Sequence, residues 1–79
     1  MTSKHAMDKV MAELERATEN FGTFANSHEG YAVLLEEVDE LWDAIKSNDH
    51  YLARDEAVQV AAMAVRFLVD LYDNEGDVL

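Results

Sequence analysis

The stretch that decides the fold runs from His28 to Lys46 and reads HEGYAVLLEEVDELWDAIK. Its large apolar residues recur every three or four positions, which is the period of an α-helix with one apolar stripe. They are Tyr31, Leu34, Leu35, Val38, Leu41, Trp42 and Ile45. The pattern predicts a helix over 28–46, with Ser27 as its N-cap and Val38 at the centre of the buried stripe.

The same periodicity predicts one helix before this stretch and one after it, over 5–20 and 51–73. The first has its stripe at Met7, Val10, Met11, Leu14 and Ala17, and the second at Ala57, Val60, Met63, Ala64, Phe67 and Leu71. The segment from Phe21 to Phe24 is predicted to form a turn that carries two aromatic side chains. We expect Asn48 or Asp49 to cap the third helix at its start, and Gly76 to cap its end.

Composition agrees with an all-α fold, because the 79 residues include no proline and only three glycines. The length allows a single domain over 1–79. Short connections favour antiparallel neighbours, so we predict a small antiparallel bundle of three main helices. The chain has no cysteine, so neither a disulfide nor a thiolate metal site is available to stabilise it.

The formal net charge of −11 excludes some partners and favours others. Nucleic acid and anionic membranes would be repelled, whereas cations would be attracted. The longest uncharged run, 57–65, is too short to span a bilayer, and the N-terminus lacks the apolar run of a signal peptide. We therefore expect a cytoplasmic protein that binds neither nucleic acid nor membrane.

The third predicted helix is apolar on two sides. Beside its main face, a second strip follows its far side at Val58, Ala61, Val65, Val69 and Tyr72. Three helices from one chain do not cover both sides, so we expect oligomerisation, as a homodimer or a tetramer, to complete the bundle. The alternative is a fourth helix that this chain lacks.

Four polar side chains occupy positions that predict a metal site. Glu37 and Glu40 lie one helical turn apart and point the same way, an arrangement that can offer two carboxylates to one hard cation. Glu56 falls inside the apolar face of the third helix, with Gln59 beside it. A buried carboxylate must be protonated, paired or metal-bound, and a cation shared with Glu37 and Glu40 would satisfy all three. Alternatively, Glu56 lies in the first turn and simply reaches solvent.

These residues resemble the MazG-like all-α nucleoside triphosphate pyrophosphohydrolases. The family motif is E-x-x-E on one helix and E-x-x-D on the next. The corresponding runs here are EEVDE at 36–40 and DEAVQVAAMAVRF at 55–67. The match covers roughly residues 21–71. One position departs from the motif, since the family aspartate is Gln59 here, which brings an amide oxygen but no charge. A second departure is length, because many relatives carry a fourth helix.

The resemblance implies ligands, a reaction and a partner. Glu37, Glu40 and Glu56 would bind Mg²⁺ or Mn²⁺, with Gln59 as a weaker partner. Together with Glu36, which would orient a water or take its proton, these three glutamates would form the catalytic set. The substrate would be a nucleoside triphosphate, cleaved to a monophosphate and pyrophosphate.

Two other interpretations remain open at this level. One is a non-catalytic, degenerate helical module for oligomerisation or protein interaction, and the other is an acidic decoy that binds proteins through its charge. Aromatic and basic residues do not decide between them. Phe21, Phe24 and Trp42 can stack on a nucleobase or belong to the core, and Arg66 and Lys46 can meet phosphates or form local ion pairs, Arg66 with an acid one turn on.

Overall fold

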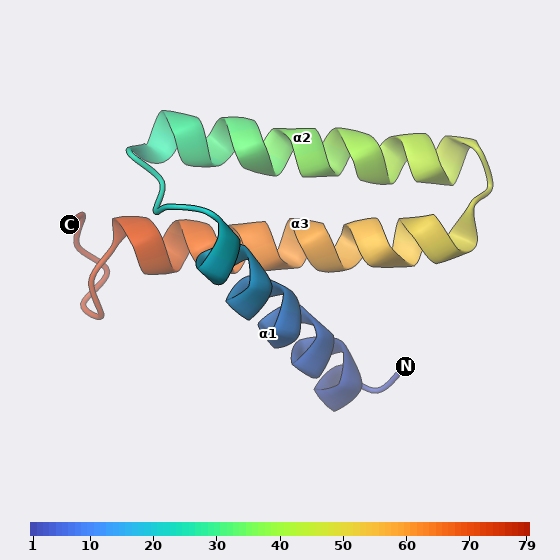
Figure 1. The fold of residues 1–79 in the computed structure, drawn as a ribbon, viewed down its shortest axis with the longest axis horizontal. Coiled ribbons are helices and arrows are strands. Elements are labelled where there is room, and N and C mark those ends of the chain that lie inside the picture. The colour runs from blue at the N-terminus through green and yellow to red at the C-terminus, as the bar shows by residue number, and fades with distance from the viewer.

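A computed structural model describes all 79 residues as three helices (Figure 1). Helix α1 spans Ser3–Asn20, α2 spans Ser27–Lys46 and α3 spans His50–Leu71. The only strand-like pairing is an isolated bridge between Tyr72 and Val78. The three predicted helices are therefore confirmed, with ends displaced by no more than two residues.

Each helix begins at a side-chain cap. Thr2, Asn26 and Asp49 accept hydrogen bonds from backbone N–H groups three residues further on, at 3.1, 2.9 and 3.0 Å. The prediction of Asp49 is confirmed, but the prediction of Ser27 is wrong by one residue, because Asn26 has the extended backbone that a cap requires.

The end of α3 also differs from the expectation. The helix stops at Leu71, Tyr72 is its extended C-terminal residue, and Gly76 lies in a turn beyond it with φ +86°. The predicted Gly76 cap is therefore wrong. The segment then folds back, and the Leu79 N–H donates to the carbonyl of Leu71 at 3.0 Å.

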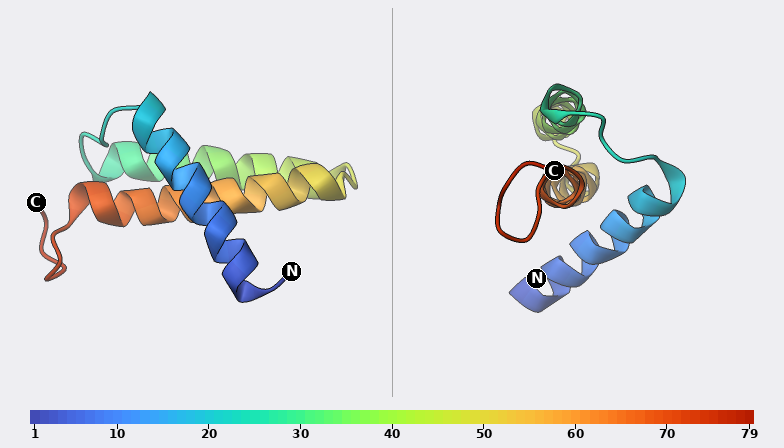
Figure 2. Two further views of the ribbon diagram at one scale, coloured as in Figure 1. Left: turned by 60° about the horizontal axis from the view of Figure 1, so that its bottom comes forward. Right: turned by 90° about the vertical axis from the view of Figure 1, so that its left-hand side faces the viewer.

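Helices α2 and α3 form the antiparallel pair expected from their short connection, whereas α1 crosses α3 obliquely and packs on α3 rather than on α2 (Figures 1 and 2). A regular antiparallel bundle of three helices is thus the wrong arrangement for α1. Its N-terminal half projects beyond the α2–α3 pair (Figure 2). None of the three helices combines the length and hydropathy needed to cross a membrane.

Small residues let α2 and α3 approach closely. A Cβ placed on Gly30 would lie 2.7 Å from the Phe67 ring, and Ala44 is 1% exposed. The side of α2 that faces α3 is therefore the one with Gly30, Glu37 and Ala44. Val38, predicted to be the centre of the buried stripe, is 41% exposed, so that prediction is wrong.

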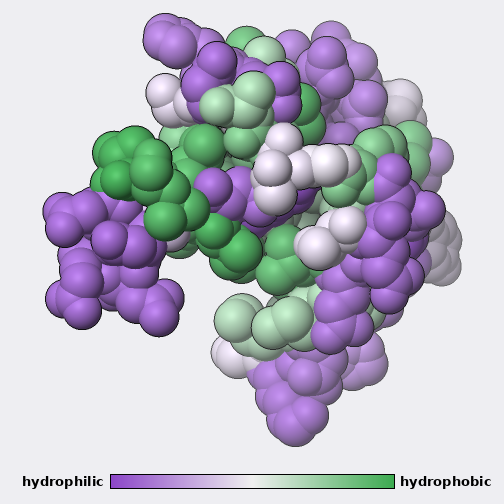
Figure 3. Space-filling view, turned by 60° about the vertical axis from the view of Figure 1, so that its left-hand side comes forward, coloured by the Kyte–Doolittle hydropathy of each residue, from purple (hydrophilic) through white to green (hydrophobic).

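The core is small. Only eight of the 79 residues are buried, and no large side chain is fully enclosed. The hydrophobic centre consists of Ala17, Phe24, Ala62, Met63 and Leu71. At the end of the molecule where the α1–α2 connection and the C-terminal segment lie, hydrophobic surface runs between strongly hydrophilic regions (Figure 3). Much apolar surface thus stays open to solvent in the single chain.

Candidate metal centre

Three glutamates meet where α2 and α3 pack together. Glu37 and Glu40 come from α2 and Glu56 from α3, and one carboxylate oxygen of each lies within 4.8 Å of the others. Glu37 and Glu56 are half-buried, whereas Glu40 is exposed. The structure thus brings together the three acids that the sequence marked as ligands.

The local sequence explains this meeting. The i, i+3 spacing of Glu37 and Glu40 stacks them on one side of α2. The antiparallel α3 returns along that side, so the early position of Glu56 in α3 faces the second half of α2. The expectation that Glu56 lies within the face of α3 turned toward the helix pair agrees with its half-buried position.

The electrostatics of the cluster are unfavourable for three charges. Burial raises the pKa of Glu37 to about 7, and the nearby carboxylates of Glu40 and Glu56 push it the same way. Burial also raises the pKa of Glu56; repulsion from Glu40 adds to this, while a hydrogen bond to Glu37 opposes it. Without a cation, the cluster therefore favours protonated carboxyl groups up to a higher pH than free glutamates do.

One atom of the cluster lacks any partner. The Oε2 oxygen of Glu56 has no exposed surface and accepts no hydrogen bond. No lysine or arginine forms a salt bridge with any of the three glutamates, because the five ion pairs of the chain lie elsewhere. An unpartnered buried carboxylate oxygen among two other carboxylates fits a hard divalent cation that takes oxygen ligands.

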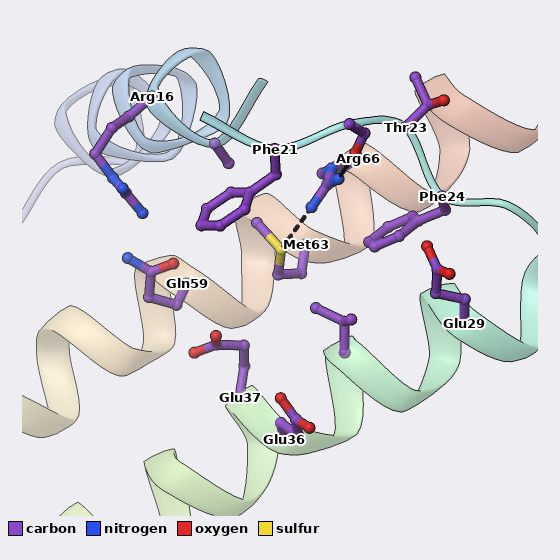
Figure 4. A pocket seen from close by; sticks show the side chains of 13 residues that line it. Arg16, Phe21, Thr23, Phe24, Glu29, Glu36, Glu37, Gln59, Met63 and Arg66 are labelled. Carbon is purple, nitrogen blue, oxygen red and sulfur yellow. Dashed lines mark hydrogen bonds between the residues drawn. The ribbon is translucent and has the colours of Figure 1, made fainter. Parts of the chain in front are cut away.

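A cleft of about 560 Å³ opens beside the cluster, between α2, α3 and the end of α1 (Figure 4). Glu37 links the two features, because it belongs to the cluster and also lines the cleft. Glu36 and Gln59 line the cleft as well but are not part of the three-glutamate cluster. The remaining wall is formed by Arg16, Ala17, Phe21, Gly22, Thr23, Phe24, Glu29, Val33, Met63 and Arg66.

The α1–α2 connection forms one wall of the cleft, and Arg66 holds it in place. The buried guanidinium of Arg66 donates to the carbonyl of Gly22 and lies 4.1 Å from the centre of the Phe24 ring. Arg66 also pairs with Asp70, with Nε 3.4 Å from Oδ2, and that carboxylate accepts from the Phe24 N–H at 3.0 Å. The local ion pair with an acid one turn on, one of the two alternatives left open for Arg66 by the sequence, is thus formed, and the side chain is buried at 7% exposure.

Arg16 is a basic wall residue that sequence reasoning did not single out. Its guanidinium makes a forked hydrogen bond to Glu13, which raises the pKa of Arg16, and the nearby charge of Glu37 adds a smaller effect in the same direction. The pKa of Glu13 is lowered, chiefly by Arg16 and less by the Gln59 side chain, which places Gln59 beside α1. The signal in the sequence is the position of Arg16, five residues before the break in the helical pattern at Phe21.

The other aromatic and basic candidates differ in their exposure and in whether they line the cleft. Phe24 is buried, whereas Phe21 is 58% exposed on the cleft wall. Trp42 does not line the cleft; it contacts Lys46, whose Nζ lies 5.6 Å from the ring centroid and 3.3 Å from Asp43 Oδ1. Of the three aromatic candidates, Phe21 alone combines exposure with a place in the cleft.

Comparisons of the chain with protein-family models, with characterised proteins and with solved structures found no match.

Proposed function

We propose that this chain is a metal-dependent nucleotide pyrophosphohydrolase that cleaves nucleoside or deoxynucleoside triphosphates to a monophosphate and pyrophosphate. The observation that carries the proposal is the unpartnered Oε2 oxygen of Glu56, buried beside Glu37 and Glu40 at the edge of a cleft. The resemblance of the two acidic half-motifs to the MazG-like family supplies the reaction. Such an enzyme would serve nucleotide house-cleaning in the cytoplasm.

Glu37, Glu40 and Glu56 would hold Mg²⁺ or Mn²⁺, with Gln59 near enough to the cleft to assist through its amide oxygen. Bound there, the cation would supply positive charge for a polyphosphate that the acidic chain otherwise repels, and would lower the pKa of a water molecule. Glu36 lies on the cleft and is exposed, so its carboxylate is available to orient a water or accept its proton.

The cleft walls fit the remaining parts of a nucleotide. Arg16 places a guanidinium on the wall near Glu37, where it can donate hydrogen bonds to phosphate oxygens. The exposed ring of Phe21 offers a flat apolar surface to a nucleobase. The volume of about 560 Å³ lies within the roughly 300–1,000 Å³ of ordinary small-molecule sites.

We also propose that the enzyme works as a homo-oligomer. The support is the small core, because a chain that buries eight of its 79 residues leaves much of its apolar surface exposed. Below about 80 residues, a single core rarely supplies enough stability, and without cysteines association is one of the few remaining means.

One observation favours a different function. Gln59 brings no charge where the family motif has an acid, so only three carboxylates gather in the cluster. A chain that had lost catalysis could persist as a helical oligomerisation or interaction module. In that case Mg²⁺ would neither raise the melting temperature nor promote pyrophosphate release.

The deciding experiment is pyrophosphate release from a panel of canonical and modified nucleoside triphosphates, with Mg²⁺ and with EDTA. Wild type is compared with Glu37→Ala and Glu56→Ala, and with Asp39→Ala as a matched control on the solvated side of α2. Mg²⁺-dependent release that the first two variants lose and the control retains would support the enzyme. No release from any substrate by the folded wild type would leave the non-catalytic module.

A further inference from the structure

Helix α2 carries an exposed apolar seam with the spacing of a coiled coil. Its residues are Tyr31, Leu35, Val38, Trp42 and Ile45, which follow one another at alternating steps of four and three. All five are exposed, by 41% to 61%. A seam with a 3.5-residue period is typical of a helix that packs against a second helix along its whole length.

The seam continues onto α3 and lies away from the candidate metal centre. A shallow apolar groove of about 330 Å³ joins the two helices and is lined by Tyr31, Leu34, Ala64, Phe67 and Leu68. The α2 residues that line the cleft, by contrast, are Glu29, Val33, Glu36 and Glu37, none of which belongs to the seam. Helix α1 packs against the other side of α3 and leaves this face uncovered (Figure 2).

We propose that this face binds a second copy of the same chain, with the two α2 helices antiparallel about a two-fold axis at Val38. The proposal locates the homo-oligomer interface and does not depend on the enzymatic activity. The seam is nearly symmetric about Val38, because Tyr31 and Ile45 each lie seven positions from it and Leu35 and Trp42 lie three and four positions from it. Antiparallel pairing therefore sets Tyr31 opposite Ile45 and Leu35 close to Trp42 of the second copy. Each large aromatic residue then meets an aliphatic one, and Val38 meets itself.

Self-complementarity and charge favour a second copy as the occupant. The face carries exposed aromatic side chains and, beside them, a groove lined in part by the small Ala64. An exposed side chain of each copy can therefore pack into the groove of the other. No charged residue interrupts the seam, although each chain carries a net charge of −11. Parallel pairing would instead stack Trp42 on Trp42 and Tyr31 on Tyr31 of the second copy.

The available area fits a dimer. Five large side chains, each about half exposed, present on the order of 450 Å² per copy. The exposed α3 residues that line the adjoining groove, Ala64 and Leu68, bring the face toward the roughly 800 Å² that each partner buries in a standard interface. Because the core of the single chain is small, burial of this face in a dimer would add apolar contacts that the monomer lacks.

Analytical ultracentrifugation over a range of concentrations tests the interface. Wild type should be a dimer, and Val38→Glu should weaken association at least about a hundredfold, because two like charges meet at the axis. Val38→Lys should do the same, and mixing the two variants should restore the dimer. Ala32→Glu, on the exposed solvated side of α2, is the matched control and should stay dimeric. A monomeric wild type, or a Val38→Glu variant that dimerises like wild type, would overturn the proposal.

Cysteine cross-linking tests the antiparallel direction in a chain that has no cysteine of its own. A mixture of Leu35→Cys and Trp42→Cys chains should form a disulfide-linked heterodimer on oxidation. Leu35→Cys alone should not cross-link, because antiparallel pairing separates the two copies of residue 35 by about 10 Å along the axis, beyond the reach of a disulfide. Efficient cross-linking of Leu35→Cys alone would mean parallel pairing and would overturn the proposed direction.

Discussion

The guanidinium of Arg66 lies 4.1 Å from the centre of the Phe24 ring, at the buried junction where the α1–α2 connection meets α3. This contact joins residues 42 positions apart and fixes one wall of the cleft. Asp70 completes it, since its carboxylate both pairs with Arg66 and accepts from the Phe24 N–H. The shape of the candidate site thus depends on an ion pair that touches none of the three glutamates.

Replacing Arg66 by methionine should destabilise the protein by about 3–5 kcal/mol, because Asp70 would be left as a buried charge without its partner. Urea denaturation followed by circular dichroism measures the change. Arg54→Met is the control, since Arg54 pairs with Asp55 in the open and should contribute less than about 1 kcal/mol. Equal effects of the two substitutions would show that the Arg66 pair does not hold the junction.

The helices follow closely from the sequence because caps and apolar spacing are local signals. The packing does not, and α2 shows why. The large apolar stripe around Val38 marks the obvious core face, yet Gly30 and Ala44 allow the closest approach to α3, so the helices pack there. Distances between helices depend on the smallest side chains, which hydropathy patterns weigh least.

The candidate site also has one part that local sequence spacing predicts and one part that depends on how the helices pack. The grouping of Glu37, Glu40 and Glu56 was predictable, because i, i+3 spacing and an antiparallel return are enough to bring them together. The cleft was not predictable, since its wall needs the oblique crossing of α1, and no sequence pattern encodes that angle. Arg16 and Arg66 acquire their places only through this crossing and the connection that follows it.

In metal-free protein, stability should fall as pH rises from about 4.5 through about 7. The folded pKa of Glu37 is raised to about 7 from an ordinary value of 4.5, so folding favours the protonated form. Its stabilising contribution is therefore complete below the unfolded pKa and is lost as pH rises through the folded pKa. Melting temperatures in EDTA across this range should drop less for Glu37→Gln than for wild type.

Asp39→Asn is the matched control, because it removes one negative charge from the exposed side of α2. It should reproduce the wild-type slope, whereas a slope as shallow as that of Glu37→Gln would assign the effect to net charge. Saturating Mg²⁺ should reduce or reverse the wild-type drop, since cation and protons compete for the same oxygens.

Replacing Gln59 by aspartate should tighten Mg²⁺ binding by about tenfold, the lower end of the effects of residues that support metal ligands. The substitution adds a carboxylate at the edge of the cleft, next to Glu37 in Figure 4. Isothermal titration calorimetry measures the affinity, and Gln59→Asn is the neutral control. Unchanged affinity would indicate that residue 59 serves the Glu13–Arg16 pair of α1 and not the cation.

Replacing Phe21 by alanine should separate recognition of the base from cleavage of the phosphates. The ring is 58% exposed on the cleft wall, so its loss should leave the fold intact. Stacking of a base on an aromatic ring contributes about 1–3 kcal/mol, which predicts a loss of roughly 5- to 150-fold in kcat/KM for a nucleoside triphosphate. Inorganic tripolyphosphate has no base, so its cleavage should be unchanged. Phe21→Trp should retain activity on the nucleotide. Equal losses on both substrates would instead mean that Phe21 shapes the phosphate end of the cleft.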